Sequence, residues 1–312
     1  MEQLILGIDS GGSKTIACLG RLNETGTPQE LGRGTAGPAN LNSVERSEVL
    51  KNITDAVAAA FAAAGIPRRT VASAVLAAAG SDRDENRNVF IEWAHDIALA
   101  DRFRIVHDAW PVLAAGTPEC WGVALISGTG SIAFGRAADG RTTRAGGWGF
   151  LFGDEGSGYA LAVAGLRAAA QAADGRIAPT QLLPAALQQF HIDRPEALVA
   201  AVYPLAGDRQ RIAEFAKPVL DLAAGGDAVA VAIVHEAARQ LAAMVGAVAA
   251  RLDVAGETIP LALTGGVLVA SQLLQNRLVK ELHALKINIG PIAVVNEPVL
   301  GALKLACDRE LN

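Results

Sequence analysis

A short segment near the start of the chain has the residue types of a phosphate-binding loop. The apolar run 4–8 ends in Asp9, and small, hydroxyl-bearing and basic residues follow: Gly11, Gly12, Ser13, Lys14 and Thr15. A second run of β-forming residues leaves the turn, so we predict a strand, a tight loop and a strand. Glycine lets a backbone approach a ligand closely, and the loop N–H groups can then face an anion. The segment therefore predicts a site that binds phosphate groups, with Thr15, Ser13 and Lys14 as further donors.

Asp9 adds a carboxylate at the end of the first predicted strand, where it can hold a hydrated Mg²⁺. The loop is not of the Walker type, because the pattern GxxxxGK[ST] is absent and the next segment has the composition of a strand. A plain hairpin turn without a ligand is the alternative interpretation, since short glycine motifs are weak evidence by themselves.

The same pattern recurs in the middle of the chain. Segment 122–136 again runs from an apolar stretch through a loop to a second apolar stretch, and the loop holds Gly128, Thr129 and Gly130. Both segments close with the pair Gly-Arg, at 20–21 and at 135–136. Two related units explain this internal repeat better than two unrelated turns do. We predict that each unit contributes one phosphate-binding hairpin, and that the two hairpins face each other across a cleft.

A candidate catalytic carboxylate follows a short predicted strand, 103–107. Asp108 comes directly after this strand, and strand ends are where an open α/β sheet exposes groups that contact ligands. We therefore take Asp108 as the candidate general base. The alternative is that it caps the helix that begins at Ala109. His107 should point to the opposite face if the strand continues through it.

The elements around these motifs alternate between strands and helices. Segment 145–158 is so rich in glycine that its backbone must turn tightly or approach something closely. Mixed sheets with helices on their faces follow from the predicted order, and 312 residues suit about two domains. We predict an α/β fold with domains 1–118 and 119–312. The principal predicted helices and later strands are 43–64, 84–98, 158–173, 227–252 and 299–309, and 71–79, 259–264 and 292–295.

Composition limits the classes of partner. The formal net charge is −5 and no run of Lys or Arg occurs, which argues against a nucleic-acid surface. The cysteines Cys18, Cys120 and Cys307 form no CxxC pair, so we expect reduced thiols and a cytoplasmic location. The start Met-Glu-Gln has no basic n-region, and no apolar run approaches the roughly 18 residues of a membrane span. The five histidines show no metal-binding spacing.

Four motifs together resemble the N-acetylglucosamine kinase branch of the BadF/BadG/BcrA/BcrD ATPase-like group, within the sugar kinase/Hsp70/actin superfamily. They are DSGGSKT at 9–15, SGTGS at 127–131, GGWG with GDEGS at 146–157, and TGGV at 264–267. The resemblance spans nearly the whole chain. It implies two ribonuclease-H-like (actin-like ATPase) domains with the active site in the interdomain cleft. It also implies ATP, Mg²⁺, a homodimer, and transfer of the γ-phosphoryl group to the 6-hydroxyl of N-acetylglucosamine.

The resemblance also implies a role for each candidate residue. Asp108 accepts the proton of the sugar 6-hydroxyl, and Asp9 orients Mg²⁺ through water. The phosphates of ATP lie against Gly11, Gly12, Ser13, Lys14, Thr15, Gly128, Thr129 and Gly130. The adenosine lies against Thr264, Gly265 and Gly266. The sugar contacts Asn40, Ser81, Asp108, Gly146, Gly147, Trp148 and Asp154.

Structural roles are the alternatives for several of these residues. Segment 264–266 also fits an ordinary turn between a strand and a helix, and Asn40 fits a loop residue near a helix cap. Trp148 fits either a contact with the sugar ring or its acetamido methyl, or a core aromatic. Asp154 and Glu155 also suit the start of the following helix, where acidic groups complement the helix dipole. The role of Glu155 is left open.

Other functions share parts of this pattern. A kinase for glucosamine, N-acetylmuramate, N-acetylmannosamine or glucose would use the same motifs, and nothing in them identifies the 2-substituent. A dehydratase activator of the same group needs paired cysteine ligands for a [4Fe-4S] cluster, and residues 121–306 contain no cysteine. A sugar-sensing protein without catalysis is disfavoured by the presence of Asp9 and Asp108.

Overall fold

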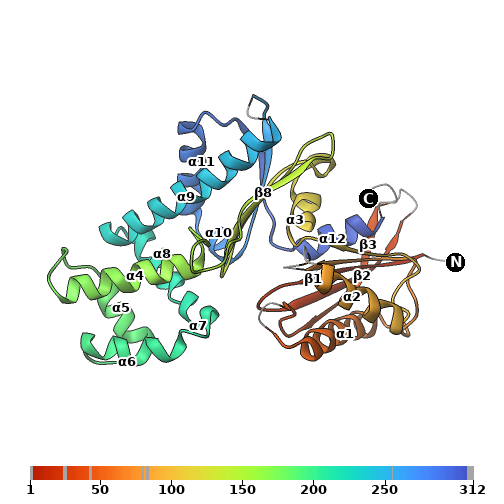
Figure 1. Cartoon of the computed structure of the whole chain (residues 1–312), viewed down its shortest axis with the longest axis horizontal. Helices are drawn as coiled ribbons and strands as arrows, with labels where there is room; N and C mark the ends of the chain where they lie inside the picture. Colours follow the sequence, from red (N-terminus) through yellow and green to blue (C-terminus); the bar gives the residue numbers. More distant parts are fainter. Residues whose placement is uncertain are drawn as a thin grey trace. The chain divides into compact units, whose positions relative to one another are not determined.

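Two compact units make up the chain (Figure 1). The computed structural model describes residues 3–23, 27–41, 44–78, 81, 84–254 and 256–307. The first unit comprises residues 1–120 and 297–312, and the second comprises residues 121–296. Each unit has its own buried apolar cluster, so each holds a core of its own.

The first unit is built on a five-stranded mixed sheet in the order β3-β2-β1-β4-β5. The first three strands are antiparallel neighbours, whereas β4 and β5 run parallel to β1. The pair Ser10 and Thr15 closes the predicted first hairpin between β1 and β2. The strands are β1 (Leu4–Ser10), β2 (Thr15–Leu22), β3 (Pro28–Ala36), β4 (Ser73–Ala78) and β5 (Phe103–Val106).

Helices cover both faces of this sheet, with α1 and α2 on one side and α3 and α12 on the other (Figure 1). Helix α1 packs closely on β3, because a Cβ atom at Gly32 or Gly34 would overlap the α1 backbone. Helix α1 begins after Glu45, and residue 43, where the predicted helix begins, lies outside the described residues. The helices are α1 (Arg46–Ala63), α2 (Asp84–Asp96), α3 (Ala109–Gly116) and α12 (Pro298–Cys307).

The second unit repeats the topology of the first, with the sheet order β10-β9-β6-β7-β8. Strands β6, β7 and β8 are antiparallel, and β9 and β10 run parallel to β6. The internal repeat predicted from the sequence is thus confirmed as a repeated fold, although strand β8 was not predicted. The strands are β6 (Gly122–Ser127), β7 (Ser131–Arg136), β8 (Thr142–Gly146), β9 (Ile259–Thr264) and β10 (Ile289–Val294).

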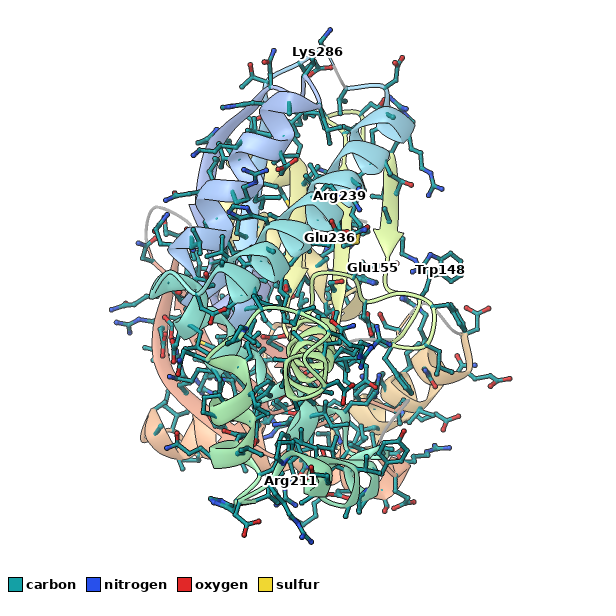
Figure 2. The ribbon with its side chains drawn as sticks, turned by 90° about the vertical axis from the view of Figure 1, so that its left-hand side faces the viewer. Trp148, Glu155, Arg211, Glu236, Arg239 and Lys286 are labelled. Carbon is teal, nitrogen blue, oxygen red and sulfur yellow. The ribbon has the colours of Figure 1, made fainter. Side chains whose placement is uncertain are left out.

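The helices of the second unit include α9, which is long and apolar enough to span a membrane by length and composition. It packs against β7, β8, α8 and α11, and Glu236 and Arg239 form an ion pair on its exposed side (Figure 2). This packing explains its apolar content as that of a core helix. The helices are α4 (Gly158–Ala173), α5 (Leu182–Gln189), α6 (Leu198–Val202), α7 (Arg209–Ala213), α8 (Ala216–Ala224), α9 (Ala228–Leu252), α10 (Gly266–Ala270) and α11 (Gln272–Ala284).

One element departs from the predicted domain boundary. The sequence prediction placed all of 119–312 in the second domain, whereas α12 belongs to the first unit and packs on β1 and α3. A Cβ atom at Gly7 would overlap the backbone of Leu303, and one at Gly301 would overlap the backbone of Pro111. Glycine at these two positions therefore permits the close approach of α12 to the first sheet and to α3.

Candidate functional site

The first hairpin presents an open turn. The Gly11 N–H donates to the Lys14 carbonyl at 3.1 Å, which closes the turn, while Gly12, Ser13 and Lys14 are exposed. A Cβ atom at Gly12 would meet nothing within 4 Å. Among the described residues, no protein acceptor is found for the N–H groups of Gly12 and Ser13. Two backbone donors are thus available to an anion, as the sequence pattern predicts.

Hydroxyl groups at the base of this hairpin hold the loop that follows β3. The Thr15 Oγ1 donates to the Gly37 carbonyl at 2.9 Å, and the Ser10 Oγ donates to the Ala39 carbonyl. The Ala39 N–H in turn donates to the Gly11 carbonyl at 3.1 Å. These bonds bring Asn40 beside the hairpin. Thr15 is buried and its hydroxyl already has an acceptor, so its contact with a phosphate stays a prediction.

In the second hairpin, too, two hydroxyl groups at the base hold a later loop. The pair Ser127 and Ser131 closes it, and both hydroxyls donate to carbonyl groups of a later loop. The Ser127 Oγ lies 2.8 Å from the Gly156 carbonyl oxygen, and the Ser131 Oγ lies 2.7 Å from that of Glu155. The structure therefore brings two separate sequence motifs, 127–131 and 153–157, into one place.

The turn of the second hairpin rests on the start of α4. The Gly158 N–H donates to the Gly128 carbonyl at 2.7 Å, and the Tyr159 N–H donates to the Thr129 carbonyl at 3.4 Å. Ser157 caps the helix by accepting the Ala160 N–H at 3.2 Å. The positive end of a 16-residue helix thus lies beside the turn, where it favours negative charge.

Asp154 lies against the second hairpin and is buried. Its Oδ1 accepts the Ser131 N–H at 3.1 Å, and a Cβ atom at Gly130 would lie 2.8 Å from that oxygen. Burial raises the pKa of Asp154 above its ordinary value, while the Ser131 N–H and the charge of Arg209 oppose the rise. The side chain of Asp154 thus binds the backbone of the second hairpin. Its contact with a sugar stays a prediction.

The glycine-rich loop before Asp154 exposes Trp148. Three of its glycines have positive φ, with values of 79°, 71° and 82° at Gly146, Gly147 and Gly149. The Trp148 side chain is 63% exposed and projects outward from the ribbon in Figure 2. The guanidinium carbon of Arg144 lies 5.4 Å from its ring centre. The alternative that Trp148 is a core aromatic is therefore wrong, and the ring is available to a ligand.

Asp9 and Asp108 interact through their charges within the first unit. The pKa of Asp9 is raised from its ordinary value of 3.8 to about 7, chiefly by burial and then by the negative charge of Asp108. The positive charge of Lys14 opposes this rise. Mg²⁺ is often held by one or two carboxylates together with water and substrate phosphates. No cluster of three or more metal-binding side chains occurs within the described ranges. The oxygen donors present therefore fit a magnesium ion that is held mainly by water and phosphate.

Asp108 stands at the cap position of α3, yet its side chain makes no capping hydrogen bond. Its Oδ1 lies 2.8 Å from the Nδ1 of His107, which accepts the Ala109 N–H at 3.2 Å. Among the described residues, this buried Oδ1 has no hydrogen-bond partner. The expectation that His107 points to the opposite face depended on a strand that continues through it; β5 ends at Val106, so its alternation does not extend to His107.

Two further predicted residues use their hydroxyls to join strand ends. The Ser81 Oγ donates to the Val106 carbonyl at 3.2 Å, and residues 79–80 before it lie outside the described residues. The Thr264 Oγ1 donates to the Val295 carbonyl at 2.6 Å. Gly265 has φ of 95° and packs against the second hairpin, whereas Gly266 is exposed with open space around it. Only Gly266 of this trio thus presents open backbone to a ligand.

Comparisons with known proteins agree with this architecture. An N-acetylmuramic acid/N-acetylglucosamine kinase of Clostridium acetobutylicum is 30% identical over 97% of this chain and 99% of its own length. An N-acetyl-D-glucosamine kinase of Dictyostelium discoideum is 29% identical over 99% of both chains. A solved structure of a candidate N-acetylglucosamine kinase from Chromobacterium violaceum is 26% identical and has a TM-score of 0.75, covering 98% of this chain and 99% of that one.

The family model for the BadF/BadG/BcrA/BcrD ATPases matches residues 6–306, which is nearly the whole chain. The match includes both hairpins, the glycine-rich loop and helix α12. The protein therefore belongs to the BadF/BadG/BcrA/BcrD ATPase family.

Proposed function

We propose that the protein is an ATP-dependent kinase that phosphorylates the 6-hydroxyl of N-acetylglucosamine. The observation that carries the proposal is the 30% identity, over 97% of this chain, to a kinase named for N-acetylmuramic acid and N-acetylglucosamine. The exposed turn of the first hairpin and the helix start beside the second hairpin support it, since both favour bound phosphate. We further propose a cytoplasmic homodimer.

Phosphoryl transfer depends mainly on positioning and charge neutralisation. In the proposed mechanism both hairpins, 11–15 and 128–130, bind the phosphates of one ATP, and segment 264–266 contacts its adenosine. Asp9 would hold Mg²⁺ through water, and such an ion would supply positive charge to the phosphate oxygens. The exposed N–H groups of the first turn and the helix start beside the second suit these roles.

Asp108 is proposed to orient the sugar 6-hydroxyl and to accept its proton. Its side chain is 28% exposed and makes no capping bond, so the carboxylate can meet a substrate. In a loose transition state the attacking hydroxyl loses its proton late, so early proton removal contributes little. Orienting the hydroxyl is therefore the larger part of the role of Asp108. The remaining proposed sugar contacts are Asn40, Ser81, Gly146, Gly147, Trp148 and Asp154.

N-acetylmuramic acid is a second candidate substrate, because the Clostridium relative is named for both sugars. The two sugars differ at the 3-hydroxyl, which carries a lactyl ether in N-acetylmuramic acid. Glucosamine, N-acetylmannosamine and glucose complete the panel of sugars to be compared.

The test is ADP release from Mg-ATP with each sugar, followed by NMR of the product to locate the phosphate. We expect the highest kcat/KM with an N-acetylated amino sugar and phosphate coupling to the protons on C6. Release of ADP at the sugar-free rate with every sugar would contradict the proposal.

A dehydratase activator is disfavoured by the cysteines. Cys18 and Cys120 are buried and Cys307 is partly buried, and these three described cysteines form no disulfide. The pKa of Cys18 is raised to about 12, chiefly by burial and then by Glu30. An anaerobic preparation should show no iron–sulfur absorbance.

A further inference from the structure

Arg209 is a cation beside the second hairpin that the proposed mechanism does not yet use. Its guanidinium carbon lies 5.1 Å from the centre of the Phe150 ring. The Phe150 ring packs edge-on against Tyr159, with ring centres 5.4 Å apart. The Tyr159 N–H donates to the Thr129 carbonyl in the hairpin turn. A continuous set of contacts thus connects Arg209 to the turn that we propose binds phosphate.

The charge balance at this turn calls for a cation. The carboxylate of Asp154 is buried against Gly130 and Ser131. An anion bound to the same turn would lie near this carboxylate, and two negative charges repel strongly where little water separates them. The helix start and the backbone N–H groups supply only partial positive charges. A full positive charge beside the turn would offset the repulsion between a bound phosphate and Asp154, in addition to the charge supplied by Mg²⁺.

Arg209 meets this need. Its positive charge lowers the pKa of Asp154, against the larger rise caused by burial. No salt bridge involving Arg209 is found among the described residues, so no ion pair neutralises its charge. Stacking on Phe150 restricts the orientation of the guanidinium, which reduces the entropy lost when it binds a ligand.

We propose that Arg209 is a further phosphoryl-binding residue, whose guanidinium contacts the terminal phosphoryl group of ATP at the second hairpin. The proposal rests on the proposed kinase function and deepens it. The planar fork of a guanidinium matches two phosphate oxygens at once, which a lysine ammonium cannot do. Because the terminal group is the one transferred, the contact would help binding of ATP but not binding of ADP.

The test compares ADP with the non-hydrolysable ATP analogue AMPPNP, both with Mg²⁺, by calorimetry on the full chain. We expect Arg209→Gln to weaken AMPPNP binding about tenfold or more, the value of a charge-assisted hydrogen bond, and to change ADP binding less than about twofold. Arg209→Lys should give an intermediate loss, because it keeps the charge without the fork.

The control is Arg211→Gln in the same helix. Arg211 is exposed, and in Figure 2 it lies at the lower edge of the view, well below Trp148 and Glu155. The backbone N–H of Arg211 donates to the Asp208 side chain, and a glutamine at this position keeps this backbone donor. We expect Arg211→Gln to bind both nucleotides as the wild type does, and thermal melting will verify that each variant is folded.

Three results would overturn the proposal. Arg209→Gln could weaken the binding of ADP and of AMPPNP equally, or could weaken the binding of neither nucleotide. It could also raise only the KM for the sugar, which is expected if Arg209 acts only on Asp154. In each of these cases wild-type kinase activity would still support the proposed function. A wild-type protein that binds neither nucleotide would instead contradict the proposed function itself.

Discussion

At the scale of single residues, the account depends on two carboxylates and on backbone donors. Asp9 and Asp108 interact electrostatically in the first unit, and Lys14 opposes their negative charge. The hydroxyls of Thr15, Ser81 and Thr264 already donate to carbonyl groups of the protein. The chemistry that we propose therefore requires the carboxylates, while these hydroxyls hold loops and strand ends in place.

Asp108→Asn tests the proposed base. The amide keeps the shape of the side chain but cannot accept the proton of the sugar hydroxyl, so we expect kcat to fall about a hundredfold or more. The KM for the sugar should change little, because an amide still forms hydrogen bonds. ADP release measured at saturating sugar checks this, and a kcat near that of the wild type would count against Asp108 as the base.

The pKa of Asp9 predicts how stability changes with pH. Since the folded protein raises this pKa from 3.8 to about 7, it binds a proton that the unfolded chain has already lost between these values. The contribution of Asp9 to stability should therefore decrease as pH rises from about 4 to about 7. Asp9→Asn cannot ionise, and each pKa unit is worth about 1.4 kcal/mol, so the variant should be a few kcal/mol more stable at pH 8.

Urea unfolding at pH 5 and pH 8 measures this difference, with the exposed Asp101→Asn as the control. We expect Asp9→Asn to gain stability mainly at pH 8 and to lose kinase activity at both. An unchanged pH dependence would show that Asp9 is not held in a protonated state by the fold.

At the scale of elements, each hairpin is joined to a later loop by paired hydroxyls. Ser10 and Thr15 hold residues 37–39, and Ser127 and Ser131 hold residues 155–156. These acceptors are backbone carbonyl groups 22 to 29 residues away in the sequence. The repeated use of this device in two units indicates that the hairpin and its loop act as one rigid element.

Ser127→Ala tests this connection. The change removes the donor to the buried Gly156 carbonyl, which should cost about 1–3 kcal/mol of unfolding free energy. We also expect a higher KM for ATP, because the hairpin turn loses part of its support. The exposed Ser47→Ala is the control and should leave both quantities unchanged. Equal stability of the two variants would contradict a structural role for the Ser127 hydroxyl.

The elements show which features a sequence can reveal. Runs of apolar residues ending in glycine predicted both hairpins, since they encode strands and turns locally. Strand β8 was missed because its residues, Thr142–Gly146, are partly exposed or glycine and give no strong alternation. The strand predicted over 103–107 ends one residue earlier, at Val106, so strand alternation could not be used to orient His107. No sequence pattern indicated a role for Arg209, because the residues that it contacts come from distant segments of the chain.

At the scale of the whole molecule, two copies of one sheet topology form a single chain. The last helix, α12, completes the first unit, so the first unit combines both ends of the sequence. The predicted boundary at 118 was close to the end of the first segment, but composition cannot show that a helix returns to an earlier sheet. The glycines at 7 and 301, which allow the return, are ordinary strand and helix residues by sequence alone.

Gly7→Ala tests the packing of α12 on the first sheet. An added Cβ would overlap the Leu303 backbone, and backbone cannot move aside cheaply, so we expect a loss of about 1–3 kcal/mol in unfolding free energy. The control Gly256→Ala adds a methyl group where nothing lies within 4 Å. Chemical unfolding of both variants makes the comparison. A Gly7→Ala protein as stable as the control would contradict the close packing of α12 on β1.

The central claim is that the two hairpins bind the phosphates of one nucleotide. Hydrogen–deuterium exchange with and without Mg-AMPPNP tests it most directly, because exchange reports on backbone N–H groups. We predict that the analogue slows exchange in the segments 10–15 and 128–131 together, with the same dependence on its concentration. Protection of only one of these segments, or of neither, would contradict the account.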